Sequence, residues 1–109
     1  MANTFTSYFN KDVGVTAATV VTIGADTQTT IIGMSCANTT ISPITVSAYI
    51  TRSAVDYYLI KTATVPVGGT LVIVGGDQKV VLLTSDVLKV VSSAAASLDA
   101  VTSVLNITA

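Results

Sequence analysis

Six aspartates, a single cysteine and two glycine pairs are the residues of this 109-residue chain whose types could support chemistry. The chain has no histidine, which excludes Ser-His and Cys-His nucleophiles and every histidine metal site. The aspartates stand singly beside glycine, serine or the end of an apolar run, without the D-x-D-x-D spacing of a calcium loop. We expect them to shape turns through hydrogen bonds to nearby backbone amides. They are Asp12, Asp26, Asp56, Asp77, Asp86 and Asp99.

A pair of aspartates could instead serve a small hydrolase, which would need two carboxylates within about 10 Å in one polar cleft. The sequence supplies few polar groups for such a cleft, so this is the weaker alternative. Cys36 has no histidine, lysine or arginine near it in the sequence that would lower its pKa. We therefore expect a buried structural thiol, and no catalytic residues, cofactor-binding residues or metal ligands.

The two glycine pairs lie in VPVGGTLVIVGGDQKVVL, residues 65–82, and raise the question of phosphate binding. A phosphate loop requires a glycine-rich turn between a strand and the N-terminus of a helix. Here each pair is followed by a run of β-branched residues, and neither the GxGxxG spacing nor a Gly-Lys-Ser/Thr ending is present. Gly68–Gly69 and Gly75–Gly76 are therefore predicted to be turns between strands, where glycine adopts positive φ without strain.

The segments around these turns are predicted to be strands. Threonine and valine dominate the chain, and β-branched residues favour pleated sheets over helices. Ile44, Val46, Ala48 and Ile50 alternate with polar or hydroxyl-bearing residues, as in a half-buried strand. Eight strands are predicted, over residues 15–25, 29–37, 44–51, 57–65, 70–74, 79–83, 87–93 and 100–108.

This spacing of strands predicts an all-β fold: a single antiparallel β-sandwich, jelly-roll-like, with about eight strands. Residues 1–14 are expected to form a less regular N-terminal arm, and residues 15–109 the single sandwich domain. The runs LVIV and KVVLL are apolar on both faces of a strand, although only one face of a small sandwich covers its core. We expect the other face to meet another copy of the chain.

Composition excludes two classes of partner. Half of the residues are hydrophobic, only 10% are charged, and the net charge is −1. Without clustered lysine and arginine, the chain has no electrostatic means of attracting nucleic acid or an anionic membrane. No apolar stretch approaches the roughly 20 residues of a spanning helix, and the start shows no signal-peptide pattern. We therefore expect no nucleic-acid partner, no membrane partner and no signal peptide.

Aromatic residues are the candidates for a protein interface, because buried aromatic side chains often dominate contact energy. Phe5, Tyr8 and Phe9 lie in the expected arm, which either packs on its own domain or docks on a neighbouring subunit. Tyr57 and Tyr58 are adjacent, so a strand should point one towards the edge of the core and the other outward. A carbohydrate-binding module could use the cluster that these tyrosines form with Asp56.

Several short motifs follow one another along the second part of the chain. They are an N-T-(T/S) turn, the run D-Y-Y-L-(I/V)-K, a P-x-G-G-(T/S)-L turn, the run G-x-Q-K-(V/I)-V-L, a turn aspartate before L-x-V, and a final strand after (V/L)-D. Together, over roughly two-thirds of the chain, they resemble small virion structural proteins of tailed bacteriophages, with Ser85 where that family usually has glycine. The matching positions are Asn38, Asp56–Lys61, Pro66–Leu71, Gly76–Leu82, Asp86–Val90 and Leu98–Ile107.

The resemblance implies a non-enzymatic structural component of a tailed-phage virion, made in the host cytoplasm. A capsid decoration or cement protein is narrowly favoured over a neck, tail or baseplate component. The implied partners are further copies of the chain, with a trimer favoured, and other virion proteins such as the major capsid protein or tail proteins. A receptor- or carbohydrate-binding module of a fibre is the alternative from a different functional class.

Overall fold

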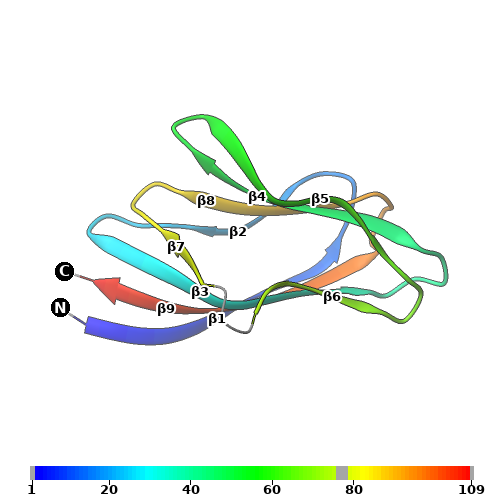
Figure 1. The fold of residues 1–109 in the computed structure, drawn as a ribbon, viewed down its shortest axis with the longest axis horizontal. Helices are drawn as coiled ribbons and strands as arrows, with labels where there is room; N and C mark the ends of the chain where they lie inside the picture. The colour runs from blue at the N-terminus through cyan, green and yellow to red at the C-terminus, as the bar shows by residue number, and fades with distance from the viewer. Residues whose placement is uncertain (1, 76–78, 109) are drawn as a thin grey trace.

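Nine β-strands form the fold in the computed structural model, which describes residues 2–75 and 79–108. Those two ranges contain no helix, and therefore none that could cross a membrane. The strands pack as two antiparallel sheets in an elongated body of 45 × 27 × 22 Å (Figure 1). Their bounds are β1 Ala2–Val13, β2 Ala18–Thr22, β3 Thr27–Asn38, β4 Ile44–Arg52, β5 Val55–Val65, β6 Thr70–Val74, β7 Val80–Leu82, β8 Val87–Ser92 and β9 Leu98–Thr108.

The strand pairing identifies the topology. Sheet A has the order β1-β9-β3-β6, with the short β7 also paired to β3, and sheet B has the order β2-β8-β4-β5. The first strand thus pairs with the last, β2 with β8, β3 with β6 and β7, and β4 with β5. A long antiparallel hairpin rolled into two sheets has this pairing, which is the jelly-roll arrangement. The predicted all-β antiparallel sandwich is confirmed.

The structure differs from the sequence-based expectation at the N-terminus. Instead of a less regular arm over residues 1–14, residues 2–13 form β1, which pairs with β9 from Ala2↔Thr108 to Asn10↔Ala100. The sequence signal is weak because β1 lies at the edge of its sheet and buries a single side chain, that of Val13. A strand that buries so little needs no regular apolar pattern. The described part of the expected arm therefore belongs to the sandwich.

The core between the sheets is largely aliphatic. Ile44, Val46 and Ala48 of β4 point into it, as their alternation predicted, and Ile50 is partly buried near the end of the strand. Cys36 of β3 is fully buried among these side chains, and burial raises the pKa of its thiol to about 12. The thiol is therefore protonated at neutral pH and acts as a small packing residue, as expected.

The first glycine pair forms the turn between β5 and β6. Gly68 has a φ of 69°, in the left-handed region that favours glycine, and the Gly69 amide donates to the Pro66 carbonyl at 3.0 Å. A strand follows this turn rather than a helix, so the predicted structural role is confirmed. The second pair, Gly75–Gly76, extends into residues 76–78, which lie outside the described residues.

Asn38, at the end of β3, holds this end of the sandwich together. Its buried carboxamide donates to the carbonyl of Ser42 at 2.8 Å and to those of Val65 and Pro66 at 3.2 and 3.3 Å. Its carbonyl oxygen accepts from the Thr40 amide and hydroxyl. The N-T-T motif is thus a structural cap, which joins the loop after β3 to the turn after β5.

Candidate functional site

The outer face of sheet A, turned away from the core, exposes five large apolar side chains. Phe5 and Phe9 of β1 are 75% and 74% exposed, Val72 of β6 63%, Val81 of β7 54% and Val101 of β9 43%. These five residues are called the apolar face below. Exposed apolar side chains grouped on one face of a protein often mark an interaction site.

Strand register arranges the apolar face into two rows that cross sheet A. Each row begins with a phenylalanine on β1, continues through an apolar residue of β9 and a hydroxyl-bearing residue of β3, and ends with an exposed valine on the opposite edge. In register, the first row is Phe9, Val101, Ser35 and Val72, and the second is Phe5, Leu105, Thr30 and Val81. The face therefore carries two rows, called the ridges below, in which one hydroxyl-bearing residue of β3 interrupts the apolar side chains.

A trough of small residues separates the two ridges. Ser7, Ser103 and Gly33 stand in register across β1, β9 and β3, and Ile32 is the extra residue of a bulge before Gly33. Two shallow hollows border Ser103, with volumes of about 220 and 280 Å³. Ridges beside hollows give the surface a relief into which the side chains of a partner can fit.

Charged residues are confined to the rim of this surface. Among the side chains that the described parts of β1, β9 and β3 direct outward, Lys11 and Asp99 carry the charges, and the Lys11 Nζ lies 3.6 Å from an Asp99 oxygen. Depletion of charge from the centre of a patch is the compositional mark of a protein interface.

The prediction that the aspartates shape turns holds for Asp26, before β3, and for Asp86, whose carboxylate accepts the Leu83 amide. Asp12, Asp56 and Asp99 lie within strands instead. Asp12 and Asp26 adopt positive φ values of 54° and 53°, and Asp99 accepts the Asp12 amide at 3.0 Å. Asp12 and Asp99 both lie near Lys11 on the open surface, rather than in the polar cleft that a hydrolase requires. Asp77 lies outside the described residues, and the described ones contain no cluster of three metal-ligating side chains.

The structure separates the five predicted interface residues into three groups. Phe5 and Phe9 lie together on the apolar face. Tyr8 points to the opposite side of β1 and packs against the core, half-buried. Tyr57 and Tyr58 belong to β5 at the edge of sheet B. Sequence reasoning placed no interface residue at Val72, Val81 or Val101, although the two-sided apolar runs contain the first two.

The expectation that one tyrosine of the adjacent pair fills the edge of the core is corrected, because Tyr57 and Tyr58 are 58% and 45% exposed. The β4–β5 hairpin rises away from the body of the sandwich, so its inner side has no opposing sheet to pack against (Figure 1). The Tyr58 ring stacks on that of Tyr49, with centroids 5.0 Å apart, and the Lys61 Nζ lies 4.9 Å from the Tyr58 centroid. Tyr58 is therefore in contact with Tyr49 and Lys61 on its own sheet.

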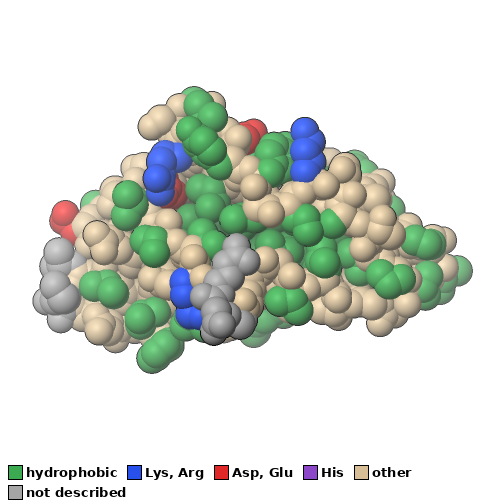
Figure 2. Space-filling view, in the orientation of Figure 1, with side chains coloured by type: hydrophobic (Ala, Val, Ile, Leu, Met, Phe, Trp, Pro, Cys, Tyr) green, Lys and Arg blue, Asp and Glu red, His purple; other side chains and the backbone are tan. Residues whose placement is uncertain are grey.

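A cleft of about 400 Å³ opens beneath this hairpin, lined by Ile50, Arg52, Tyr57 and Val81. Val81 lies on the edge strand β7, so it borders both this cleft and the apolar face. Figure 2 shows hydrophobic side chains at the bottom of the hollow below the hairpin. Its polar wall is Arg52, which also anchors the hairpin to the turn between β7 and β8 through Asp86. Among the described residues that line the cleft, Ile50 and Val81 are aliphatic and Arg52 is the cation.

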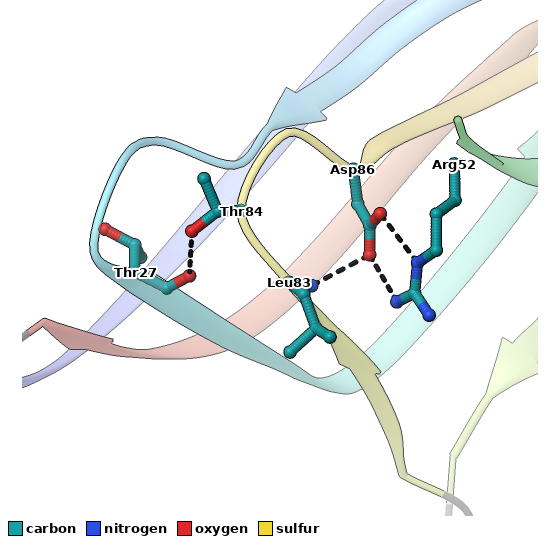
Figure 3. Close-up of polar contacts among 5 residues, drawn as sticks. All are labelled: Thr27, Arg52, Leu83, Thr84 and Asp86. Carbon is teal, nitrogen blue, oxygen red and sulfur yellow. Dashed lines mark hydrogen bonds and ion pairs between the residues drawn. The ribbon is translucent and has the colours of Figure 1, made fainter. Parts of the chain in front are cut away.

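Arg52 and Asp86 form an ion pair across 34 residues of sequence (Figure 3). The Arg52 Nε donates to one carboxylate oxygen of Asp86 at 2.8 Å, and its Nη2 donates to the other. The Leu83 amide also donates to Asp86 at 2.8 Å. The Arg52 hydrogen bonds, assisted by Leu83, lower the pKa of the buried Asp86 carboxyl. No sequence spacing could have indicated this pair, because only the fold brings the two strand ends together.

Comparisons with known proteins identify the fold and no family. No protein-family model matches the chain, and no curated protein matches it in sequence. A protein of Bacillus endospore appendages, which form a novel family of disulfide-linked pili, aligns with a TM-score of 0.57 and 16% identity, over 98% of this chain and 87% of its own length.

The capsid protein VP2 of infectious bursal disease virus aligns in two further structures. A mutant VP2 protein in derived T=1 particles gives a TM-score of 0.60 at 14% identity, over 97% of this chain and 32% of VP2. VP2 in a subviral particle gives 0.59 at 13% identity, over 97% of this chain and 33% of VP2. The chain therefore spans about a third of the VP2 chains that it matches. At these identities, the likeness establishes a shared jelly-roll fold.

Proposed function

We propose that this chain is a non-enzymatic structural subunit of a virion, which assembles with other copies of itself through sheet A. The observation that carries the proposal is the apolar face, where two phenylalanines stand about three-quarters exposed on a surface whose charges lie at the rim. Leaving such a surface in water is unfavourable by roughly 25 cal/mol per Å² of apolar area, so burying it against a partner drives association.

The compared structures support the proposal because the same fold builds assemblies in two settings, a viral particle and a bacterial appendage. The motifs that resemble those of tailed-phage virion proteins favour a phage virion within this class. They favour a capsid decoration or cement protein narrowly over a neck, tail or baseplate component. Other virion proteins, such as the major capsid protein or tail proteins, would then be partners.

Association of this subunit would not involve a disulfide bond formed by Cys36. The compared pili are described as disulfide-linked, whereas the single Cys36 of this chain is fully buried and its thiol pKa is raised. Non-covalent burial of apolar surface is therefore the proposed source of affinity. Addition of a reducing agent should leave the assembled mass unchanged.

The experiment that tests the proposal measures the mass of the protein by sedimentation and light scattering from micromolar to several hundred micromolar concentration. The wild type should reach a multiple of the 11.1 kDa chain mass. A Phe5→Ala/Phe9→Ala variant should need at least tenfold more protein to associate, because truncating interface aromatics typically costs about 2 kcal/mol or more. Its thermal unfolding should stay close to that of the wild type, since both side chains lie outside the core.

Ile41→Ser serves as the matched control. Ile41 is 94% exposed in the loop between β3 and β4, so its replacement removes an exposed apolar side chain that does not belong to the apolar face. A wild type that stays monomeric over the whole concentration range would refute the proposal. So would a double variant that associates as strongly as the wild type.

A carbohydrate-binding module remains the second function predicted from sequence. Its candidate residues, Tyr57 and Tyr58 beside Asp56, do not form one platform: Tyr57 lines the cleft beneath the hairpin, while Tyr58 is occupied by Tyr49 and Lys61. The geometry therefore favours the assembly role.

A further inference from the structure

The open edge of β1 is the longest regular sheet edge that the described part of the chain leaves unpaired. β9 pairs with one side of β1, and β1 is the last strand on that side of sheet A. A side-chain contact reaches across near its far end, where the Asn10 carboxamide donates to the Thr19 carbonyl at 3.3 Å. The register with β9 is unbroken from Ala2 to Asn10, so this edge has no bulge over nine residues.

Native proteins usually protect such an edge with charge, proline, a bulge or short length. Residues 2–10 contain no charged residue and no proline. The other edges have these devices: β2, β6 and β7 are short, with at most five residues each. The long β5 carries Lys61 and a bulge at Thr62, which has a φ of 49° and donates its amide to the Ser47 hydroxyl. β1 alone among these edges has the form of a strand that accepts a partner.

The sequence of β1 is complementary to itself about Ser7. In an antiparallel pair of two copies centred there, Ser7 faces Ser7 of the second copy, and Phe5 of each copy faces Phe9 of the other. Cross-strand aromatic pairs of this kind stabilise antiparallel sheets. Thr6 faces Tyr8 on the other side of the sheet, and no like charges stand opposite each other.

The hydrogen-bonding pattern permits the same register. In an antiparallel ladder, alternate residues of β1 direct their amide and carbonyl groups towards β9, and the residues between direct theirs to the open edge. Pairing about Ser7 matches odd positions with odd and even with even. Each residue with free backbone groups at the edge therefore meets another residue with free groups.

We propose that β1 pairs antiparallel with β1 of a second copy, about a two-fold axis through Ser7, so that the two A sheets join into one. This inference rests on the proposed assembly function and specifies which strands of two copies bind each other. The two ridges would continue across the axis, because the Phe5 row of one copy meets the Phe9 row of the other. The joined sheet presents twice the apolar surface of one chain, with Ser7 at its centre.

The two-fold contact predicts two chains, rather than the three expected from the phage resemblance, as the smallest assembly. Closed two-fold contacts use one patch on both subunits, as this register does. A larger particle would then contain an even number of chains wherever every β1 edge is paired.

Single-cysteine crosslinking tests the register. In the proposed pair, the Ser7→Cys residues of two copies have Cα atoms about 4.5–5.5 Å apart, within the range of a disulfide. Ser103 lies in register with Ser7 on β9, so two copies of Ser103→Cys are separated by three strand spacings, about 14 Å, and cannot link. Cys36 can stay in both variants because it is fully buried.

We expect Ser7→Cys to form a disulfide dimer under mild oxidation at least tenfold faster than Ser103→Cys, at concentrations where the wild type associates. The reduced variant should unfold thermally like the wild type. If the wild type associates but Ser103→Cys links as fast or faster, the sheets pack face to face and the edge pairing is refuted, while the assembly function stands. If the wild type never associates and neither variant links, both proposals fail.

Charged side chains introduced at Ser7 provide a second, independent test of the register. Ser7→Lys and Ser7→Asp should each weaken the dimer at least tenfold when alone, because like charges then stand opposite each other. An equimolar mixture should recover dimers that contain one chain of each kind. A mixture that stays as weak as its components would overturn the two-fold register, whatever the wild-type mass.

Discussion

Asp86 shows how one buried polar residue serves several parts of the fold. Its carboxylate is 2% exposed and binds Arg52 from the end of β4 and the Leu83 amide from the turn before β8. A buried carboxylate is tolerated only when such partners replace its water. The nearby Thr84 hydroxyl donates to the Thr27 carbonyl, which ties the same turn to β3 (Figure 3). Asn38 plays the corresponding part at the β3–β4 loop and the β5–β6 turn.

The lowered pKa of Asp86 predicts a specific loss of stability in acid. The folded-state pKa lies below that of the unfolded chain, about 3.9, so the pair contributes its full stability above that value. The contribution disappears as the pH falls through the lowered pKa. Urea unfolding between pH 7 and pH 2 should therefore show a steeper decline for the wild type than for Asp86→Asn. Parallel curves for the two proteins would contradict this role.

At the scale of elements, the β4–β5 hairpin carries local strain. Its two turn residues, Ser53 and Ala54, have φ values of 53° and 61°, as a two-residue turn of type I′ requires. Neither residue is suited to the left-handed region, which favours asparagine and glycine. The hairpin thus keeps a turn geometry that its sequence disfavours.

Replacement of the turn by its preferred residues should stabilise the protein. We expect Ser53→Asn/Ala54→Gly to raise the free energy of unfolding by about 1 kcal/mol, measured by thermal or urea denaturation. Ala95→Gly is the control, because Ala95 is exposed in the loop after β8 and has no positive φ. An equal gain from Ala95→Gly, or none from the turn variant, would show that the hairpin is unstrained.

The elements themselves were largely predictable from local sequence. The alternation in residues 44–51, the first glycine pair and the β-branched runs each depend on neighbours along the chain, and each prediction matches the structure. The sequence did not predict β1 as a strand, because edge strands bury few side chains. It did not predict the exposure of Tyr57, because the hairpin extends past the opposing sheet (Figure 1). These two features depend on where the other sheet ends, which local sequence does not encode.

At the scale of the whole molecule, the candidate site was only partly predictable. Phe5 and Phe9 were identified as aromatic residues, but the rows that join them to Val101, Val72 and Val81 exist only through register between strands distant in sequence. The two-sided apolar runs did indicate that a second face needs a partner. Which strands share that face follows from the jelly-roll order rather than from composition.

Cys36 provides a probe of the cooperativity of the whole fold. It lies on β3 between β9 and β6, fully buried, so a thiol reagent can reach it only when sheet A opens. We expect its labelling by a thiol reagent to follow the free energy of global unfolding measured in urea. Ser103→Cys, exposed on the outer face, should label at once. Labelling of Cys36 at a clearly lower free energy would instead reveal local opening at the β6 edge.

The place of β9 has a consequence for synthesis. Residues 98–108 lie between β1 and β3, so the strand that emerges last from the ribosome among the nine must enter the middle of sheet A. Until then, β1 has no neighbour in its own sheet, and Phe5 and Phe9 of the nascent chain are not held in a folded sheet. Vectorial, strand-by-strand folding is therefore impossible for this sheet, and closure must wait for residues 98–108. Polysomes, where many unfinished chains lie close together, are the setting in which a chaperone would matter most to this protein.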